Sequence, residues 1–150
     1  MTAVIRKAIP ADADFIVESN CAMALETEQK ELSRDVVSRG VRTLLDRPEL
    51  GFYLVAVIDG QPVASLMITT EWSDWRNGLF WWVQSVYVTP DFRRQGIYRQ
   101  MYRQVQILAE EQGGVCGFRL YVERENRRAQ QTYQSLGMSE CDYRLYEQLS

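Results

Sequence analysis

The sequence predicts a single α/β domain, with a mixed, mainly antiparallel central sheet and helices on both faces. A chain of 150 residues has the usual size of one domain, residues 1–150. Three strand-like segments follow one another between residues 52 and 88, which is typical of an antiparallel meander. Beyond residue 90, helical and strand-like segments alternate, as they do in α/β proteins.

The chain begins with a short strand and two helices. Val4 and Ile5 start the strand, and a Pro-x-Asp sequence then marks a helix from about residue 11 into the low twenties. A second helix is predicted over residues 32–45, where apolar side chains recur at three- and four-residue spacing, and Pro48 ends it.

The middle of the chain predicts the meander. Residues 52–58 are apolar and rich in β-branched and aromatic side chains, and Asp59-Gly60 is a strong hairpin turn leading into a strand over residues 62–70. Residues 71–77 form a polar loop, and residues 79–88 give a long third strand.

The last part alternates helix and strand. A helix is predicted from about Gly96 to Gln112, where Gly113-Gly114 stops it. Residues 118–122 follow as a strand and residues 126–136 as a short helix. A final strand, about Cys141 to Leu149, is expected to complete the sheet.

Composition excludes several kinds of site. The chain has no His, which removes Ser-His-Asp and Cys-His catalysis and most zinc sites, so we expect no metal. Its three cysteines have no metal-ligand spacing and read as reduced. No segment is long and apolar enough to span a membrane, and acidic residues interrupt any signal peptide, so we expect a cytoplasmic protein without a membrane partner.

Charge is unevenly distributed along the chain. The net charge of -3 argues against nucleic acid as a partner. Residues 12–31 hold six acidic residues against Lys30 alone, whereas residues 93–128 hold eight Arg against four Glu. This division is compatible with one region that faces a cation and another that faces a polyanion, or with two solvated faces.

The turn after residue 88 has the features of a phosphate site. A strand enters an Arg-rich turn with Gly96, and a helix begins directly after it. Free N–H groups and the positive end of the helix dipole therefore converge on one point, which favours a phosphate group. An ordinary solvated loop is the alternative reading of this turn.

Read with its surroundings, this stretch resembles the acetyl-CoA motif of the Gcn5-related N-acetyltransferase (GNAT) family. The motif corresponds to Arg93-Arg94-Gln95-Gly96-Ile97-Tyr98, and a second family motif is matched from Tyr121 through Asn126, Ala129 and Tyr133 to Gly137-Met138. The resemblance covers essentially the whole chain. It departs at Tyr98, where the family prefers Gly or Ala. It implies that the fourth and fifth strands splay apart.

The resemblance also implies acetyl-CoA as the acetyl donor and a set of residues that hold it. Backbone groups of the fourth strand would pair with the pantetheine arm, and those of the turn would hold the diphosphate. Asn126, at a strand–helix junction, would bond the arm or its neighbouring backbone, and a plain N-cap is the alternative role of this residue. Tyr133 would protonate the departing thiolate, although an aromatic at helical spacing is otherwise a core residue. The expected cofactor-binding residues are Val86, Tyr87, Val88, Arg93, Arg94, Gln95, Gly96, Ile97, Tyr98, Arg99, Asn126 and Tyr133.

The acceptor amine needs a base, because an alkylamine is almost wholly protonated at neutral pH. Many relatives place a carboxylate in the fourth strand, where this chain has Gln84, which can only orient a water. Glu26 and Glu28 are the expected catalytic carboxylates, with Glu71 and Asp74 also expected near the acceptor side. For each carboxylate, a solvated surface charge is the alternative.

Four tryptophans crowd into eleven positions. Strand alternation places Trp81 and Trp82 on opposite faces, so one is core and the other can line the cleft. Trp72 and Trp75 lie in a loop and, with Glu26 and Glu28, are expected to bind the acceptor as a cation.

These patterns predict an enzyme that transfers acetyl from acetyl-CoA to a primary amine by direct attack in a ternary complex. No Cys is placed for a covalent relay. The leading acceptor is a small amine or polyamine-like cation; a protein or peptide amine is the alternative. A non-catalytic CoA-binding module is a third reading, and a homodimer is left open.

Overall fold

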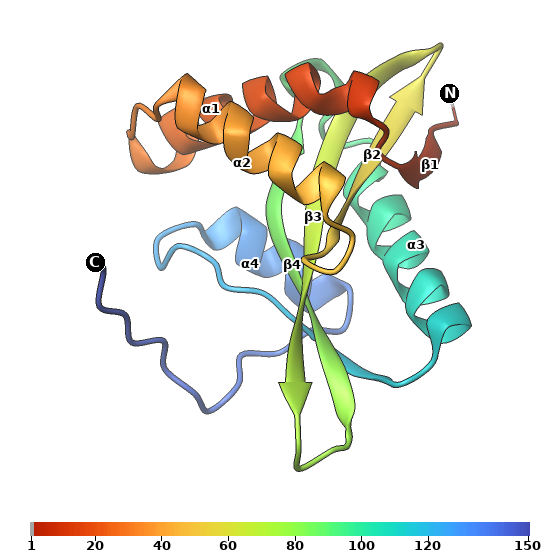
Figure 1. Ribbon diagram of the computed structural model, residues 1–150, viewed down its shortest axis with the longest axis vertical. Coiled ribbons are helices and arrows are strands. Elements are labelled where there is room, and N and C mark those ends of the chain that lie inside the picture. Colours follow the sequence, from red (N-terminus) through yellow and green to blue (C-terminus); the bar gives the residue numbers. More distant parts are fainter. Residues whose placement is uncertain (1) are drawn as a thin grey trace.

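The computed structural model describes residues 2–150, which form one five-stranded sheet with helices on both of its faces (Figure 1). The strands lie in the order β1-β2-β3-β4-β5, so β5 is at one edge. The elements along the chain are β1 (Val4–Lys7), η1 (Pro10–Asp12), α1 (Ala13–Glu28), α2 (Arg34–Asp46), β2 (Phe52–Ile58), β3 (Gln61–Ser73), β4 (Gly78–Val88), η2 (Pro90–Phe92), α3 (Ile97–Gln112), β5 (Val115–Arg119) and α4 (Arg127–Ser135).

Strand alternation divides the apolar side chains of the sheet between two cores. On one face, Leu54 and Ala56 of β2 pack with Met101 and Val105 of α3, and all four are fully buried. On the other face, Tyr53 and Val55 pack against α1 and α2. Each face is thereby covered by helices, as the predicted fold class requires.

Strands β1 to β4 form an antiparallel meander, and the turn between β2 and β3 has the residue types and dihedral angles expected of a hairpin. Asp59 and Gly60 between β2 and β3 both have positive φ, of 50° and 76°, the combination that a tight hairpin turn needs. The segment expected as a polar loop over residues 71–77 instead extends β3 to Ser73, and a turn at residues 74–77 leads into β4.

The pair β4–β5 is parallel and short. Its ladder runs from Leu79 and Val115 to Trp82 and Arg119 and then ends. Beyond this point, β4 continues for six residues to Val88 without a strand on that side. The predicted separation of the fourth and fifth strands is therefore confirmed, together with the mixed, mainly antiparallel sheet.

The boundaries predicted for two elements are wrong, and one predicted strand is absent from the structure. The first helix continues to Glu28 instead of ending in the low twenties. The fifth strand was expected at residues 118–122 but occupies Val115–Arg119, because Gly113 and Gly114 turn the chain at once and the carbonyl of Gly114 accepts a hydrogen bond from the N–H of Leu79 at 2.8 Å. The last strand, expected over residues 141–149, does not form: no residue there pairs with a strand.

Candidate active site

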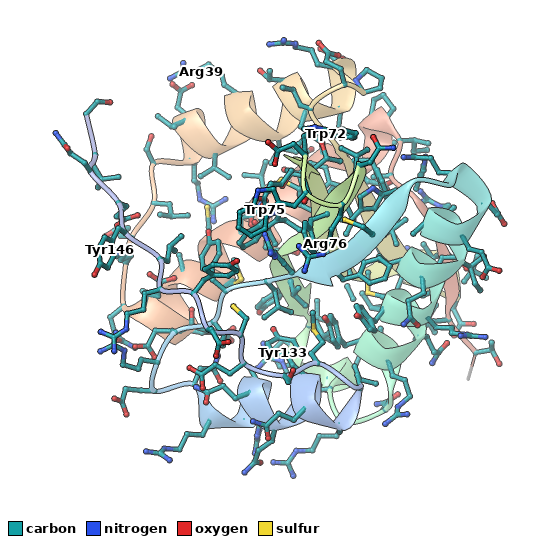
Figure 2. The ribbon with its side chains drawn as sticks, turned by 90° about the horizontal axis from the view of Figure 1, so that it is seen from below. Arg39, Trp72, Trp75, Arg76, Tyr133 and Tyr146 are labelled. Atoms are coloured by element: carbon teal, nitrogen blue, oxygen red, sulfur yellow. The ribbon has the colours of Figure 1, made fainter. Side chains whose placement is uncertain are left out.

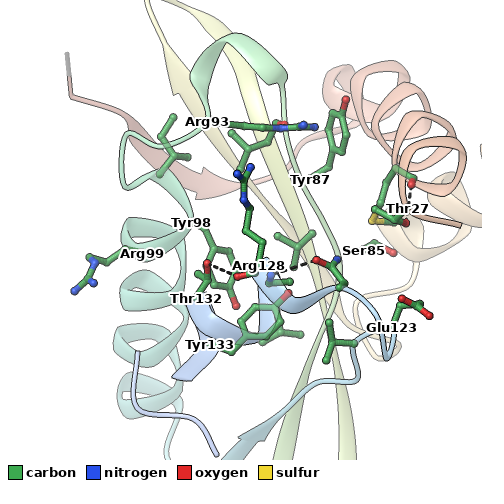
Figure 3. A pocket seen from close by; sticks show the side chains of 18 of the residues that line it. Thr27, Ser85, Tyr87, Arg93, Tyr98, Arg99, Glu123, Arg128, Thr132 and Tyr133 are labelled. Atoms are coloured by element: carbon green, nitrogen blue, oxygen red, sulfur yellow. Dashed lines mark hydrogen bonds between the residues drawn. The ribbon is translucent and has the colours of Figure 1, made fainter. Parts of the chain in front are cut away.

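A cleft of about 980 Å³ opens where β4 and β5 separate (Figure 3). Four parts of the chain line it: the end of α1, the second half of β4, the turn and first residues of α3, and the segment from Tyr121 into α4. The cleft therefore gathers residues from 23 to 136 along the chain.

The backbone of β4 forms one wall. A β-bulge places two residues, Ser85 and Val86, opposite a single residue of β3. Ser85 has a φ of 53°, unusual for a residue other than glycine. The bulge reverses which side chains face α3, so that Val86 and Val88 join that core while Gln84 and Tyr87 do not. Backbone groups between Val83 and Val88 are consequently left facing the cleft without a strand partner.

The turn before α3 forms the end of the cleft. Arg94 and Gly96 both have positive φ, 63° and 76°, and no side chain caps the helix at Gly96. The first intrahelical acceptor is the carbonyl of Gly96, which bonds the N–H of Gln100, so the N–H groups of the first turn of α3 have no helical partner. These groups make a site for an anion, strengthened by the positive end of the helix dipole.

Arg93 links the turn to the opposite side of the cleft. Its Nε donates to the carbonyl oxygen of Val88 at 2.8 Å, and a terminal nitrogen donates to Glu26 of α1 at 3.0 Å. Its guanidinium also lies 5.2 Å from the ring centre of Tyr87. Arg93 is thus held in place by β4 and α1, and Glu26 is ion-paired.

Tyr133 reaches the cleft from α4. The side-chain oxygen of Asn126 accepts a hydrogen bond from the N–H of Ala129 at 3.2 Å, so Asn126 is the N-cap of α4. Asn126 and Ala129 also line the cleft. Burial raises the pKa of the Tyr133 phenol, so the hydroxyl stays protonated well into the alkaline range.

Tyr98 occupies the position at which the sequence departs from the family motif. Its ring stacks on Tyr102 at 6.2 Å between ring centres and meets the edge of Tyr133 at 5.7 Å. Its buried hydroxyl has no hydrogen-bond partner among the described residues, and burial strongly raises its pKa. The larger residue is therefore accommodated by aromatic packing beside Tyr133.

The acceptor side holds charged groups that are already paired. Glu28 lies 3.3 Å from Lys30, and Glu26 is bound to Arg93. Gln84, which lines the cleft, accepts a hydrogen bond from the hydroxyl of Thr69 at 2.6 Å. That bond fixes the orientation of the Gln84 amide.

Beyond Gln84, a second group of side chains lies along β4. Glu71 accepts hydrogen bonds from the indole N–H of Trp82 at 2.9 Å and from Arg119 at 2.8 Å. The Trp82 bond, together with Arg119, lowers the pKa of Glu71. Trp82 lies 6.2 Å from the ring of Tyr121, which lines the cleft. Trp81, on the other face, is buried in the core as strand alternation predicted.

Not all of the predicted site residues come together. Trp72 and Trp75 lie at the β3–β4 hairpin, outside the lining of the cleft, with 60% and 85% of their surface exposed (Figure 2). Asp74 lies in the same hairpin turn. The side chain of Gln95 instead bonds the carbonyl of Asp91, and this residue does not line the cleft either. The remaining expected cofactor-binding residues all do.

Sequence reasoning missed several lining residues. Ser85 lies in the β-bulge of β4. Because most residues of this strand are apolar, the bulge does not interrupt a visible alternation of apolar and polar residues. Glu123 and Arg128 lie within or beside the second motif, so their nearness to Tyr133 could have been inferred from it (Figure 3). Thr27 lies between the two predicted carboxylates and could have been named with them.

Residues 2–150 contain neither a metal-binding cluster of side chains nor a membrane-spanning helix. No group of three or more His, Cys, Asp or Glu residues is placed to hold a metal ion in this part of the chain. In the same residues, no helix has the length and apolar character needed to cross a membrane.

Comparisons with known proteins agree on one family. A family model described as "Acetyltransferase (GNAT) family" matches residues 14–138. A crystal structure of a possible acetyltransferase from Clostridium difficile 630 is 44% identical, with a TM-score of 0.92, covering 100% of this chain and 99% of that one. A search of curated proteins returned no match.

Two more distant structures share the fold. AAC(6')-Iy in complex with a bisubstrate analog, CoA-S-monomethyl-acetylneamine, is 16% identical with a TM-score of 0.78, covering 100% of this chain and 99% of that one. Ribosomal-protein-alanine N-acetyltransferase from Brucella melitensis biovar Abortus 2308 is 17% identical with a TM-score of 0.80, covering 99% of each chain.

Proposed function

The chain belongs to the acetyltransferase (GNAT) family and is an N-acetyltransferase, and we propose that it acetylates the primary amine of a small cationic acceptor. The acetyl donor is acetyl-CoA, and transfer is direct, within a ternary complex. The observation that carries this proposal is the cleft itself, which joins an unpaired strand edge, an anion-binding helix start and a buried phenol.

The residues present suit acetyl-CoA. The pantetheine arm carries amides that need backbone partners, and β4 offers unpaired backbone groups between Val83 and Val88. The diphosphate needs N–H donors, which the uncapped start of α3 supplies after Gly96. At Gly96, an added Cβ would find nothing within 4 Å, so the space in front of the turn is open to a ligand.

Two groups of the chain would act on the reacting atoms when acetyl-CoA, which supplies the activated acetyl group, is bound. Tyr133, whose raised pKa keeps its hydroxyl protonated, donates a proton to the departing thiolate. The amine must lose a proton before it attacks, and Glu26 or Glu28 accepts it, directly or through a water held by Gln84. No covalent intermediate on the protein is needed.

A cation is favoured by the carboxylates at the α1 end of the cleft. Glu26 and Glu28 line the cleft there, and they would raise the local concentration of an amine cation. The arginines that also line the cleft, Arg93, Arg94, Arg99 and Arg128, come from the turn, α3 and α4. Glu26 forms an ion pair with Arg93, which fixes the carboxylate in position and partly neutralises its charge. Glu28, bound only to an exposed Lys30, is the freer of the two predicted carboxylates.

The exposed hairpin favours a second candidate, a peptide amine. Trp72 lies opposite Leu79, five residues along β4 from Gln84, which is roughly 17 Å at the rise of a strand. An acceptor of several residues could extend over this distance from the cleft to Trp72 and Trp75. A small amine cannot reach both.

The test is steady-state kinetics with thiol release as the readout, first with a panel of polyamines, aminoglycosides, amino acids and peptides. With the best amine, Glu28→Gln and Glu26→Gln are then measured against Glu31→Gln, which removes an exposed carboxylate from the connection directly after α1, outside the cleft lining. The variant that lacks the base should lose kcat by about 10²-fold and change its pH dependence, whereas a residue that only attracts the substrate should raise KM.

Near wild-type constants for both variants, or a preference for neutral or acidic acceptors, would refute the cation site. A preference for peptides, with a raised KM in Trp75→Ala, would establish the second candidate. Hydrolysis of acetyl-CoA without transfer to any amine would contradict both.

A further inference from the structure

Arg93 lies between two anionic partners, a carboxylate of this chain and the site proposed for the diphosphate. It opens the turn that leads to Gly96, and both residues line the cleft. Towards α1, a terminal nitrogen of Arg93 donates to the carboxylate of Glu26 at 3.0 Å. Towards α3 lies the uncapped helix start, where the diphosphate needs donors. A single guanidinium is therefore within reach of both halves of the cleft.

This pairing is peculiar to Arg93. Four arginines line the cleft, and in residues 2–150 Arg93 is the one whose guanidinium has a carboxylate partner. That partner is a carboxylate proposed to act on the acceptor, and the two residues lie 67 positions apart in the sequence. The contact consequently joins the acceptor half of the cleft to the donor half.

The ion pair is open to competition. Its side chains are 43% and 41% exposed, and ion pairs between partly solvated side chains stabilise a fold only slightly. A diphosphate carries more negative charge than one carboxylate and can accept two N–H bonds from the same guanidinium. A diphosphate in the cleft therefore competes well with Glu26 for Arg93.

The surroundings of Arg93 allow a change of partner without movement of the backbone. Its Nε donates to the carbonyl oxygen of Val88 at 2.8 Å, and its guanidinium lies over the ring of Tyr87 (Figure 3). Tyr87 is buried, so its ring is a fixed surface for the guanidinium. Rotation of one partly exposed side chain is enough to redirect the terminal nitrogens of Arg93.

We propose that Arg93 exchanges Glu26 for the diphosphate of acetyl-CoA, and that this exchange frees the Glu26 carboxylate for the acceptor amine. The inference rests on the proposed function and adds an energetic coupling between the two substrates. Before the exchange, Arg93 partly neutralises Glu26; after it, Glu26 is a free anion that can attract the amine and accept its proton. By linkage, each substrate then strengthens the binding of the other.

A static role for the ion pair makes the opposite prediction. If Glu26 only held Arg93 in position for the diphosphate, loss of the carboxylate would weaken the binding of acetyl-CoA. If Glu26 competes with the diphosphate, its loss makes Arg93 available and strengthens that binding. The direction of the change in affinity therefore separates the two roles.

The test is a double-mutant cycle in which calorimetry measures the dissociation constant of acetyl-CoA without any acceptor. Glu26→Gln should lower this constant by about 2- to 5-fold, because one exposed ion pair no longer competes. Arg93→Gln should raise it by about 10-fold, because a charged donor to the diphosphate is lost. In the Arg93→Gln background, Glu26→Gln should have no further effect, since the two residues act as a pair.

Glu28→Gln is the matched control for the carboxylate. It removes the same charge from the same end of the cleft, but Glu28 is paired with Lys30 at 3.3 Å and not with the turn. The affinity of this variant for acetyl-CoA should stay close to the wild-type value.

Three results would overturn the exchange. Unchanged or weaker binding in Glu26→Gln would show that the carboxylate does not compete with the diphosphate. Equal strengthening in Glu26→Gln and Glu28→Gln would show a general effect of charge, as would strengthening that persists in the Arg93→Gln background. These failures differ from failure of the proposed function, which would leave acetyl-CoA bound but without transfer to any amine of the kinetic panel.

Discussion

The two halves of the cleft are built in different ways. The donor half uses the backbone of one continuous stretch, from Val83 through the first turn of α3, with α4 added beside it. The acceptor half uses single side chains of α1 and β4, Glu26 and Gln84. The bonded Glu71 and Arg119, from β3 and β5, lie beyond Gln84 and outside the cleft lining. A site made of backbone groups depends on the geometry of a turn, which a few residues control, whereas a site made of side chains can be altered by single substitutions. We therefore expect binding in the donor half to tolerate few substitutions and binding in the acceptor half to tolerate more.

The largest effect is expected at Tyr133, where the two halves meet. Tyr133→Phe keeps the ring and its contact with Tyr98 but deletes the hydroxyl that we propose as the proton donor. We expect kcat to fall by about 10²-fold with little change in the affinity for acetyl-CoA, measured by steady-state kinetics and calorimetry. Unchanged turnover would make Tyr133 a packing residue of the aromatic cluster.

Two controls sharpen this result. Tyr102→Phe removes a hydroxyl from the same cluster without touching the cleft lining and should leave kcat unchanged. The pH profile is the second control: burial raises the pKa of Tyr133, so its donor form persists above the ordinary phenol value of about 10. The wild-type kcat should accordingly show no decline below about pH 10 from loss of this proton.

The next largest effect is expected in the backbone of the donor half. Gly96 has a φ of 76°, and a β-branched residue there must distort the turn that presents the first N–H groups of α3. Gly96→Val should raise the dissociation constant for acetyl-CoA by about 10-fold, measured by calorimetry.

Gly113, at the other end of α3, provides a matched control for this variant. Its φ is 77°, and an added Cβ would likewise find nothing within 4 Å. Gly113→Val should therefore lower the melting temperature by a similar amount while leaving the affinity for acetyl-CoA unchanged. Equal affinity in both variants would remove the turn from the cofactor site.

The same contrast explains what the sequence could predict. The turn chemistry of Asp59-Gly60 and the strand–turn–helix around Gly96 are local, so the meander and the strand–turn–helix that lines the cleft were predicted nearly in full. The bulge at Ser85 and the pairing of Glu71 with Trp82 and Arg119 depend on contacts between strands, which no local pattern reports. The last strand, expected at about Cys141 to Leu149 to complete the sheet, does not form, because a local sequence pattern does not say which sheet edge a strand would join.

The smallest effect is expected at Glu71, which lies beside the acceptor half and outside the cleft lining. This carboxylate is bound by Trp82 and Arg119, and its lowered pKa makes it a poor base. We therefore expect Glu71→Gln to leave kcat and its pH dependence nearly unchanged. Its effect should appear in KM, because the substitution leaves the positive charge of Arg119 without its partner.

The size of that effect follows from Coulomb's law. A cationic amine held roughly 8–10 Å from an uncompensated guanidinium in largely aqueous surroundings is repelled by about 0.5–1 kcal/mol, which is a 2- to 5-fold increase in KM. Glu49→Gln is the matched control, since it breaks an exposed carboxylate–arginine pair with Arg47 at 3.0 Å in the connection between α2 and β2. If Glu71→Gln instead lowers kcat and shifts its acid limb, the base is Glu71, and Glu26 and Glu28 serve only to attract the acceptor. If Glu71→Gln raises KM for a neutral acceptor as much as KM for a cation, the Glu71–Arg119 pair supports the shape of the acceptor half and does not act through its charge.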